Sequence, residues 1–240
     1  MGGVNLVKVP LITALIIGLS SSVLAKDVST ELSYPDGEGP FPTLIISHGS
    51  GGKSNFYYDW INKFNEWGYA TVLLDHFTNR GRRFRWHENA DIREKDVDPV
   101  LDEVLNNPKL DNDKLSLLGW SAGEVFVRKF AEKHKIKSAV LFYPSGFACH
   151  DGEVSFTAPI LVMHGSEDLT LGCWERLSYN AYQGYKKHVI YPNTYHGFDI
   201  PFFTTLRYKG RRGNLGFLYD AKVHEQSIQE TKNFLTEYAK

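Results

Sequence analysis

The sequence predicts an α/β fold in which a mostly parallel central sheet carries helices on both faces. Two observations support this prediction. Short apolar segments rich in β-branched and aromatic residues alternate with longer amphipathic segments. Each short segment is almost continuously apolar, as expected for strands buried on both faces of a parallel sheet. The 240 residues, 42% hydrophobic and 23% charged, suffice for one sizeable domain.

Six segments are expected to be strands, because each is bounded by Gly, Pro, Asn or Ser. In chain order they are 43–48, 70–76, 115–120, 138–145, 159–168 and 187–193. Four further segments show helical spacing of apolar residues. In the first of them, Phe56, Trp60 and Phe64 recur four residues apart, and Gly68 closes the helix. The four expected helices are 55–67, 96–107, 122–134 and 224–240.

Residues 1–25 have the pattern of a secretory signal peptide. Lys8 precedes a short apolar run, and small residues lead to Ala25, with Val23 at the −3 position. The alternative is a membrane anchor, but the run is shorter than the roughly 20 residues that a bilayer requires. We therefore expect cleavage after Ala25. The mature chain, residues 26–240, would be a single exported domain, periplasmic or secreted, with no stable membrane anchor.

The formal net charge of −1 gives no strong field toward nucleic acid or an anionic membrane. Segment 80–87 interleaves arginines with aromatic residues, a composition also found in single-strand-binding proteins. Because it is short, we expect a solvated loop. It follows the second expected strand, so one arginine could pair with a substrate carboxylate. The candidates are Arg80, Arg82, Arg83 and Arg85.

Ser121 lies between the third expected strand and a helix, in the pattern Gly119-Trp120-Ser121-Ala122-Gly123. In such a turn the serine is exposed in a strained conformation, and glycines avoid crowding of the neighbouring backbone. The N-terminus of the following helix favours developing negative charge. Taken alone, the pattern is also that of an ordinary turn of small residues.

Two later strands end on residues that can assist a nucleophilic serine. Asp168 follows the fifth expected strand and His196 follows the sixth. Because strands of an open parallel sheet deliver their carboxyl ends to one edge, we expect both near Ser121. His196 would take the serine proton, and Asp168 would orient the imidazole. Glu167 and Asp199 are alternative carboxylates.

An oxyanion hole is expected from backbone N–H groups. Ala122 follows the nucleophile and supplies one donor, and Ser50, in the glycine-rich turn after the first strand, supplies the other. His48 is interpreted as a residue that shapes this turn. We expect Asp75 and His164 to have structural roles.

The two cysteines, Cys149 and Cys173, follow the fourth and fifth expected strands. Since these strands should be neighbours, and an oxidising compartment favours pairing, we expect a disulfide between them. Their spacing is not that of a zinc site. We expect no metal and no cofactor.

The chain resembles the dienelactone hydrolase family over about residues 41–238. The resemblance is carried by "SHGSGG", "LLDHFTNRG", "LLGWSAG", "ILVMHGSEDLT", "YHGFD" and "YDAKVHEQSIQETKNFL". It implies an α/β-hydrolase fold with little or no cap domain, acting on esters or lactones. The best-known members carry a cysteine nucleophile where this chain has Ser121. The chain looks more like serine-bearing, exported relatives, which favours a general ester hydrolase over dienelactone as substrate.

The sequence therefore predicts an exported serine hydrolase that cleaves a small carboxylic ester or lactone through an acyl-enzyme. Three alternatives remain. A prolyl-type peptidase uses the same triad but usually adds a large second domain. An acyltransferase would admit an acceptor other than water. A binding protein without catalytic activity would retain only the fold. The sequence does not indicate an oligomeric state.

Overall fold

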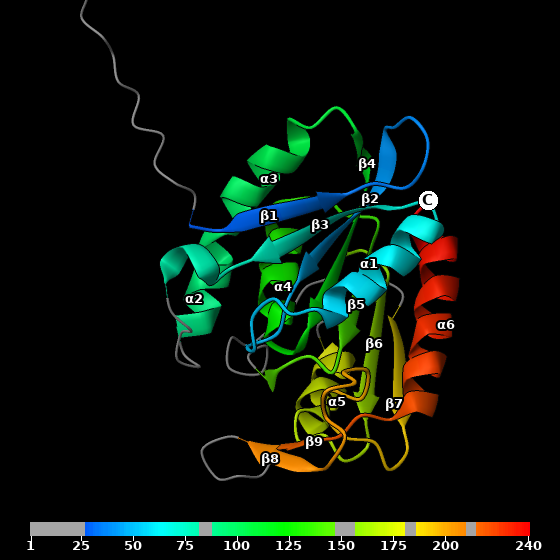
Figure 1. The fold of residues 1–240 in the computed structure, drawn as a ribbon. Helices are drawn as coiled ribbons and strands as arrows, with labels where there is room; N and C mark the ends of the chain where they lie inside the picture. The colour runs from blue at the N-terminus through cyan, green and yellow to red at the C-terminus, as the bar shows by residue number, and fades with distance from the viewer. Residues whose placement is uncertain (1–26, 82–87, 147–156, 181–185, 210–214) are drawn as a thin grey trace, which may run out of the picture.

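Strands and helices alternate along most of the chain (Figure 1). The structure is a computed structural model that describes residues 27–81, 88–146, 157–180, 186–209 and 215–240. The strands are β1 Ser29–Ser33, β2 Phe41–Ser47, β3 Ala70–Asp75, β4 Leu110–Trp120, β5 Ser138–Phe142, β6 Ile160–Gly165, β7 Lys186–Tyr191, β8 Arg207–Lys209 and β9 Leu215–Phe217. The helices are α1 Phe56–Glu66, α2 Glu88–Lys95, α3 Val97–Leu105, α4 Glu124–Lys133, α5 Leu171–Asn180 and α6 Ala221–Tyr238, with short 3₁₀ turns η1 Thr78–Arg80 and η2 Ser121–Gly123.

Seven strands form one sheet in the order β1-β3-β2-β4-β5-β6-β7. Every neighbouring pair is parallel except β1 and β3, which are antiparallel. Parallel neighbours need crossover connections, and the helices between the strands supply them. The expected mostly parallel sheet is confirmed.

Side chains alternate between two cores, one on each face of the sheet. Leu44 and Ile46 of β2 pack with Trp60 and Phe64 of α1 on one face, whereas Ile45 packs on the other. Helices α1 and α6 cover the first face, and α3, α4 and the start of α5 cover the second (Figure 1). The expected helices on both faces are confirmed as well.

Several elements differ from the sequence expectation. Strand β1, at the edge of the sheet, is not expected from the sequence, because its residues STELS have little apolar character. Helices α2 and α5 are also additional to the expected four. The expected strands 138–145 and 159–168 end early, at Phe142 and Gly165, because the chain turns there. At Tyr143 the turn takes a positive φ of 36°.

A small antiparallel hairpin, β8–β9, stands apart from the main sheet (Figure 1). It is joined to the segment after β7 by a bridge between His196 and Phe217. The hairpin therefore helps to position His196, the residue expected to act as the base. Within the described residues, no helix is long and apolar enough to span a bilayer.

Candidate active site

Ser121 occupies a strained turn between β4 and α4. Its φ is 50°, in the left-handed region that side chains other than glycine rarely adopt. The flanking glycines are required by close backbone approach. A Cβ on Gly123 would lie 2.2 Å from the Ser47 carbonyl oxygen, and one on Gly119 would lie 3.0 Å from the Glu124 nitrogen. The glycines thus let α4 begin directly against β2, with the serine held at the turn.

Ser121, His196 and Asp168 form one hydrogen-bonded chain. His196 Nε2 lies 2.9 Å from Ser121 Oγ, and His196 Nδ1 lies 2.7 Å from Asp168 Oδ2. A carboxylate only accepts, so the imidazole proton belongs on Nδ1 and the Nε2 lone pair faces the serine hydroxyl. In this tautomer the histidine is oriented to take a proton from Oγ.

The Asp168 carboxylate is buried and well hydrogen-bonded. Its Oδ1 accepts from the Thr170 N–H at 3.0 Å and from the Thr170 hydroxyl at 2.9 Å. Burial alone would raise the pKa of Asp168. The neighbouring His196 and the hydrogen bonds outweigh burial and hold that pKa below its usual value. Asp168 is therefore ionised at neutral pH.

Two aromatic rings hold the His196 imidazole. The ring of Tyr143 lies 4.5 Å from it and that of Phe217 lies 4.9 Å from it, centroid to centroid. The His196 N–H also donates to the Gly216 carbonyl at 3.1 Å. Sequence reasoning misses both aromatic contacts, because Tyr143 reads as the end of a strand and β9 has only three residues.

Asp199 has a structural position and makes no hydrogen bond to the imidazole of His196. Its carboxylate accepts hydrogen bonds from the Trp60 indole at 3.2 Å, the Trp120 indole at 2.8 Å and the Tyr143 hydroxyl at 2.6 Å. Burial raises the pKa of Asp199, although these donors oppose the rise. Through these three hydrogen bonds Asp199 connects α1, the end of β4 and Tyr143, whose ring packs on His196.

The β2–α1 turn, residues 48–52, lies against the serine. A Cβ on Gly49 would be 3.5 Å from the Ser121 Cβ. The Gly49 N–H donates to the Tyr57 hydroxyl at 2.9 Å, whereas the Ser50 N–H has no acceptor among the described residues. Ala122, fully buried, lies in the first turn of η2, where N–H groups lack helical partners. Ser50 thus follows the residue that approaches the serine, Ala122 follows the serine itself, and their role as oxyanion donors stays a prediction.

Glu124, which directly follows the serine motif, is buried. Its Oε1 accepts from the Ser145 hydroxyl at 3.0 Å, and its Oε2 lies 3.7 Å from Arg128 Nε. The Ser145 N–H in turn donates to the Ser121 carbonyl at 3.1 Å. Glu124 thus stabilises the serine turn from the interior, through Ser145 and the Ser121 carbonyl.

Arg80 is engaged within the protein. Its guanidinium binds both oxygens of Asp96, at 2.6 and 3.1 Å, and also the His76 carbonyl at 2.7 Å. Arg80 therefore pairs with the buried Asp96 carboxylate, whereas the sequence suggests it as a contact for a substrate carboxylate. The other three candidates, Arg82, Arg83 and Arg85, lie outside the described residues.

The remaining polar residues of the strand ends are structural. Asp75 accepts from the N–H groups of Phe77 and Thr78, each at 3.0 Å, and from the Thr78 hydroxyl at 2.6 Å, which confirms its expected role. His164 is buried and lies 3.0 Å from His188, nitrogen to nitrogen. Burial lowers the pKa of His164 to about 3, so it stays neutral.

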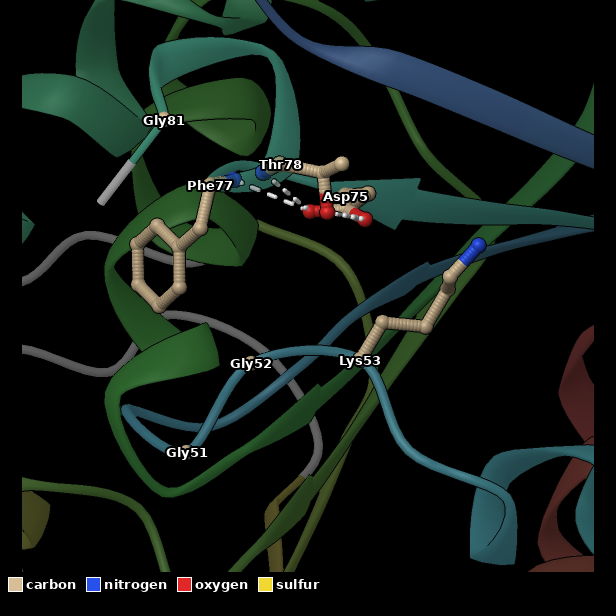
Figure 2. Close-up of a pocket in the computed structure, with 7 residues that line it drawn as sticks. All are labelled: Gly51, Gly52, Lys53, Asp75, Phe77, Thr78 and Gly81. Carbon is tan, nitrogen blue, oxygen red and sulfur yellow. Dashed lines mark hydrogen bonds between the residues drawn. The ribbon is translucent and has the colours of Figure 1, made fainter. Parts of the chain in front are cut away.

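A cavity of about 380 Å³ opens beside the β2–α1 turn. Figure 2 shows Gly51 and Gly52 on one side of it, with Asp75 and Thr78 opposite and Lys53 at its rim. The Lys53 ammonium pairs with Glu31 at 2.8 Å. The cavity thus borders the residues that follow Ser50.

The cysteines and the N-terminus fall partly outside the described residues. Cys173 is buried at the start of α5, and its Sγ lies 3.9 Å from the Gly146 carbonyl oxygen. Cys149 and residues 1–25 are not described, so the disulfide and the signal peptide stay predictions. No group of three His, Cys, Asp or Glu side chains within the described ranges is arranged to hold a metal ion.

Comparison with solved structures identifies the class of the fold. A dienelactone hydrolase from Anabaena variabilis is 20% identical with a TM-score of 0.65, over 89% of this chain and 93% of that one. Est1E from Butyrivibrio proteoclasticus, solved with ferulic acid, is 16% identical with a TM-score of 0.63, over 88% and 95%. The metagenomic P91, a dienelactone hydrolase-like promiscuous phosphotriesterase, is 16% identical with a TM-score of 0.64, over 88% and 98%. The sheet order and these likenesses define an α/β-hydrolase fold.

The family follows from the sequence itself. The family model described as "Dienelactone hydrolase family" matches residues 28–239, nearly the whole described chain. No curated protein sequence matches this chain. The chain belongs to the dienelactone hydrolase family, which places it among the carboxylic ester hydrolases. The expected resemblance and enzyme class are confirmed at that level.

Proposed function

We propose that the protein is a serine esterase that cleaves a small carboxylic ester or lactone through an acyl-enzyme. The observation that carries the proposal is the continuous hydrogen-bonded chain from Asp168 through His196 to Ser121. Ser121 is also the residue held in the strained turn. A nucleophile, a base and an orienting carboxylate in this order are the parts that acyl transfer requires.

The reaction follows from these contacts. Ser121 Oγ attacks the carbonyl carbon while His196 Nε2 takes its proton. The carbonyl oxygen gains negative charge, which the N–H groups of Ser50 and Ala122 stabilise. The C–O bond to the leaving group breaks, and His196 returns the proton to the departing oxygen. Water then attacks the acyl-enzyme with His196 again as base, which releases the acid and restores Ser121.

The substrate is proposed to be a small ester. Family membership and the titles of the Est1E and P91 structures support ester-type substrates. Of the four candidate arginines for a substrate carboxylate, Arg80 is paired with Asp96, and the other three lie outside the described residues. Neutral and anionic esters should therefore both be tested as first substrates.

The test is ester turnover by the mature chain, residues 26–240, on p-nitrophenyl esters of increasing acyl length. Replacing Ser121 with Ala should lower kcat by about 10⁴-fold or more, because no other group supplies the nucleophile. Ser54→Ala, at an exposed serine before α1, is the matched control and should keep the wild-type rate. An unchanged rate in Ser121→Ala would refute the mechanism. Addition of alcohol acceptors to the same assay separates hydrolysis from acyl transfer.

Export and the Cys149–Cys173 disulfide are further proposals. They are supported by the signal-peptide pattern of residues 1–25 and by the presence of only two cysteines, each after a neighbouring strand. The disulfide would brace the loop that carries Asp168. Two free thiols in the denatured, unreduced mature protein would contradict it.

A further inference from the structure

A fully buried arginine lies beneath the β2–α1 turn. Arg93 of α2 is 0% exposed. Its Nη1 donates to the Ser47 hydroxyl at 3.0 Å, and its Nη2 donates to the Gly49 carbonyl at 3.2 Å. No carboxylate in the described part of the chain forms an ion pair with it. Burial lowers the pKa of Arg93 to about 10, so the buried group still carries its charge at neutral pH. Burying a cation in this way is costly, which calls for an explanation.

The Gly49 carbonyl oxygen receives three donors. Besides Arg93, the Gly52 N–H donates to it at 3.2 Å and the His48 ring donates from Nδ1 at 2.7 Å. His48 Nε2 accepts from the His76 N–H at 3.2 Å, so the ring proton belongs on Nδ1. This carbonyl is therefore fixed from the interior of the protein.

The same peptide unit carries the Ser50 N–H. In a trans peptide the carbonyl and the following N–H point in opposite directions. Donors that hold the Gly49 oxygen inward therefore aim the Ser50 N–H outward, on the turn that lies against Ser121. That N–H has no acceptor among the described residues. A cation on the carbonyl also polarises the peptide and strengthens the N–H as a donor.

A second chain of hydrogen bonds fixes Arg93 itself. The Ser47 hydroxyl that accepts from Arg93 lies 3.0 Å from His76 Nε2, and His76 Nδ1 lies 2.6 Å from Asp96. Asp96 is held by the bidentate pair with Arg80. Burial, together with Arg93 and Arg80, lowers the pKa of His76, so the ring is neutral and donates to Asp96. Ser47, His76 and Asp96 are buried, so these residues can affect the reaction only by positioning Arg93.

We propose that Arg93 is a positioning residue for the oxyanion hole: its guanidinium holds the Gly49–Ser50 peptide so that the Ser50 N–H faces the developing oxyanion. The inference rests on the proposed esterase function. Arg93 is fully buried and touches no substrate in this arrangement. Its effect is therefore on stabilisation of the transition state, with little effect on binding of the ground-state ester.

The test compares Arg93→Met and Arg93→Lys with wild type in kcat, KM and the inhibition constant of an arylboronic acid. The boronic acid forms a tetrahedral adduct on the serine and places an oxygen in the oxyanion hole. Arg93→Met should lower kcat by about 10²-fold, as loss of one oxyanion donor does, with KM nearly unchanged. The inhibition constant should rise in parallel with the loss of kcat. Arg93→Lys, which keeps the charge, should recover part of both losses.

Two further variants separate positioning from loss of stability. Val104→Ala shortens a fully buried side chain of α3, in the core on the face of the sheet opposite α1. It should lower the unfolding temperature while the boronic acid inhibition constant stays near wild type. If Arg93→Met does not fold, Arg93→Lys and Ser47→Ala carry the test. Ser47→Ala removes one anchor of Arg93 and should lower kcat in the same direction.

The outcomes are distinguishable. Wild-type kcat and inhibition constant in the folded Arg93 and Ser47 variants would overturn this inference and leave the esterase function intact. A raised KM with unchanged kcat would also overturn it, because that result indicates ground-state binding. Absence of ester turnover in the wild-type protein would instead remove the proposed function.

Discussion

At the scale of single residues, the sequence identifies the residues at strand ends and misses those defined by long-range contacts. Ser121, Asp168 and His196 are recognisable because each follows an apolar run. Asp199 appears in the sequence only as a competing carboxylate. Its contact with Trp60 spans 139 residues, and no local pattern encodes it. Arg93 is likewise indistinguishable in sequence from a solvated helix arginine.

Substitution of Asp168 should mainly lower activity, whereas substitution of Asp199 should mainly lower stability. Asp168→Asn keeps the shape but cannot hold the His196 tautomer, since an amide can donate where the carboxylate only accepts. We expect kcat to fall by about 10⁴-fold, as in other triads, and stability at neutral pH to fall as well, because the folded state favours the ionised carboxylate. Steady-state kinetics with an unfolding curve measures both quantities.

Replacing Asp199 with Ala should mainly lower stability. It leaves two indole N–H groups and the Tyr143 hydroxyl buried without their acceptor. Each such group costs about 1–3 kcal/mol, so we expect a loss of at least about 3 kcal/mol in the free energy of unfolding. A loss of activity as large as in Asp168→Asn, with stability unchanged, would assign the orienting role to Asp199 instead.

At the scale of elements, long regular patterns are predictable and short ones are not. The six apolar strands and four amphipathic helices of the sequence analysis all occur, with shifted ends. Strand β1 and the β8–β9 hairpin are short and weakly apolar, so their pairing depends on the sheet edge and on His196. Tertiary contacts decide such elements where local propensity is weak.

The junction between β4 and α4 gives an element-scale prediction. Gly123→Ala places a Cβ 2.2 Å from the Ser47 carbonyl oxygen, so α4 must move away from β2. We expect a loss of about 3 kcal/mol or more in stability, together with reduced kcat because the serine turn shifts. Thermal unfolding and ester kinetics measure these effects.

Gly172→Ala is the matched control for that substitution. Gly172 lies in α5, and an added Cβ would meet no atom within 4 Å. Because alanine favours helices, we expect stability to rise by up to about 1 kcal/mol. Equal changes in stability for the two substitutions would show that the close approach of the Ser47 carbonyl to Gly123 does not require a glycine there.

At the scale of the whole molecule, the interior holds several neutral histidines. Burial lowers the pKa of His48, His76, His164 and the partly buried His224 below the usual 6.5. Each contributes stability that is lost as pH falls below about 6.5, because only the unfolded state then gains a proton. Asp96 and Asp199, whose pKa values are raised by burial, act in the opposite direction.

We therefore expect stability to fall with acid between pH 6 and pH 5. Three fully buried histidines, helped by the partly buried His224 and opposed by at most two carboxyl groups, give a net slope of at least about 1.4 kcal/mol per pH unit. Urea unfolding at a series of pH values measures it. Stability that stays constant or rises over this interval would contradict the neutral, buried state of these rings.

The central claim is that Ser121 is an activated nucleophile, and its covalent labelling tests this most directly. A fluorophosphonate loses fluoride when the serine oxygen attacks phosphorus, so intact-mass and peptide mass spectrometry locate the adduct. The account predicts one adduct per chain, on Ser121, absent in Ser121→Ala and formed much more slowly in Asp168→Asn. A folded wild-type protein that remains unlabelled, or that is labelled at another residue, would contradict it.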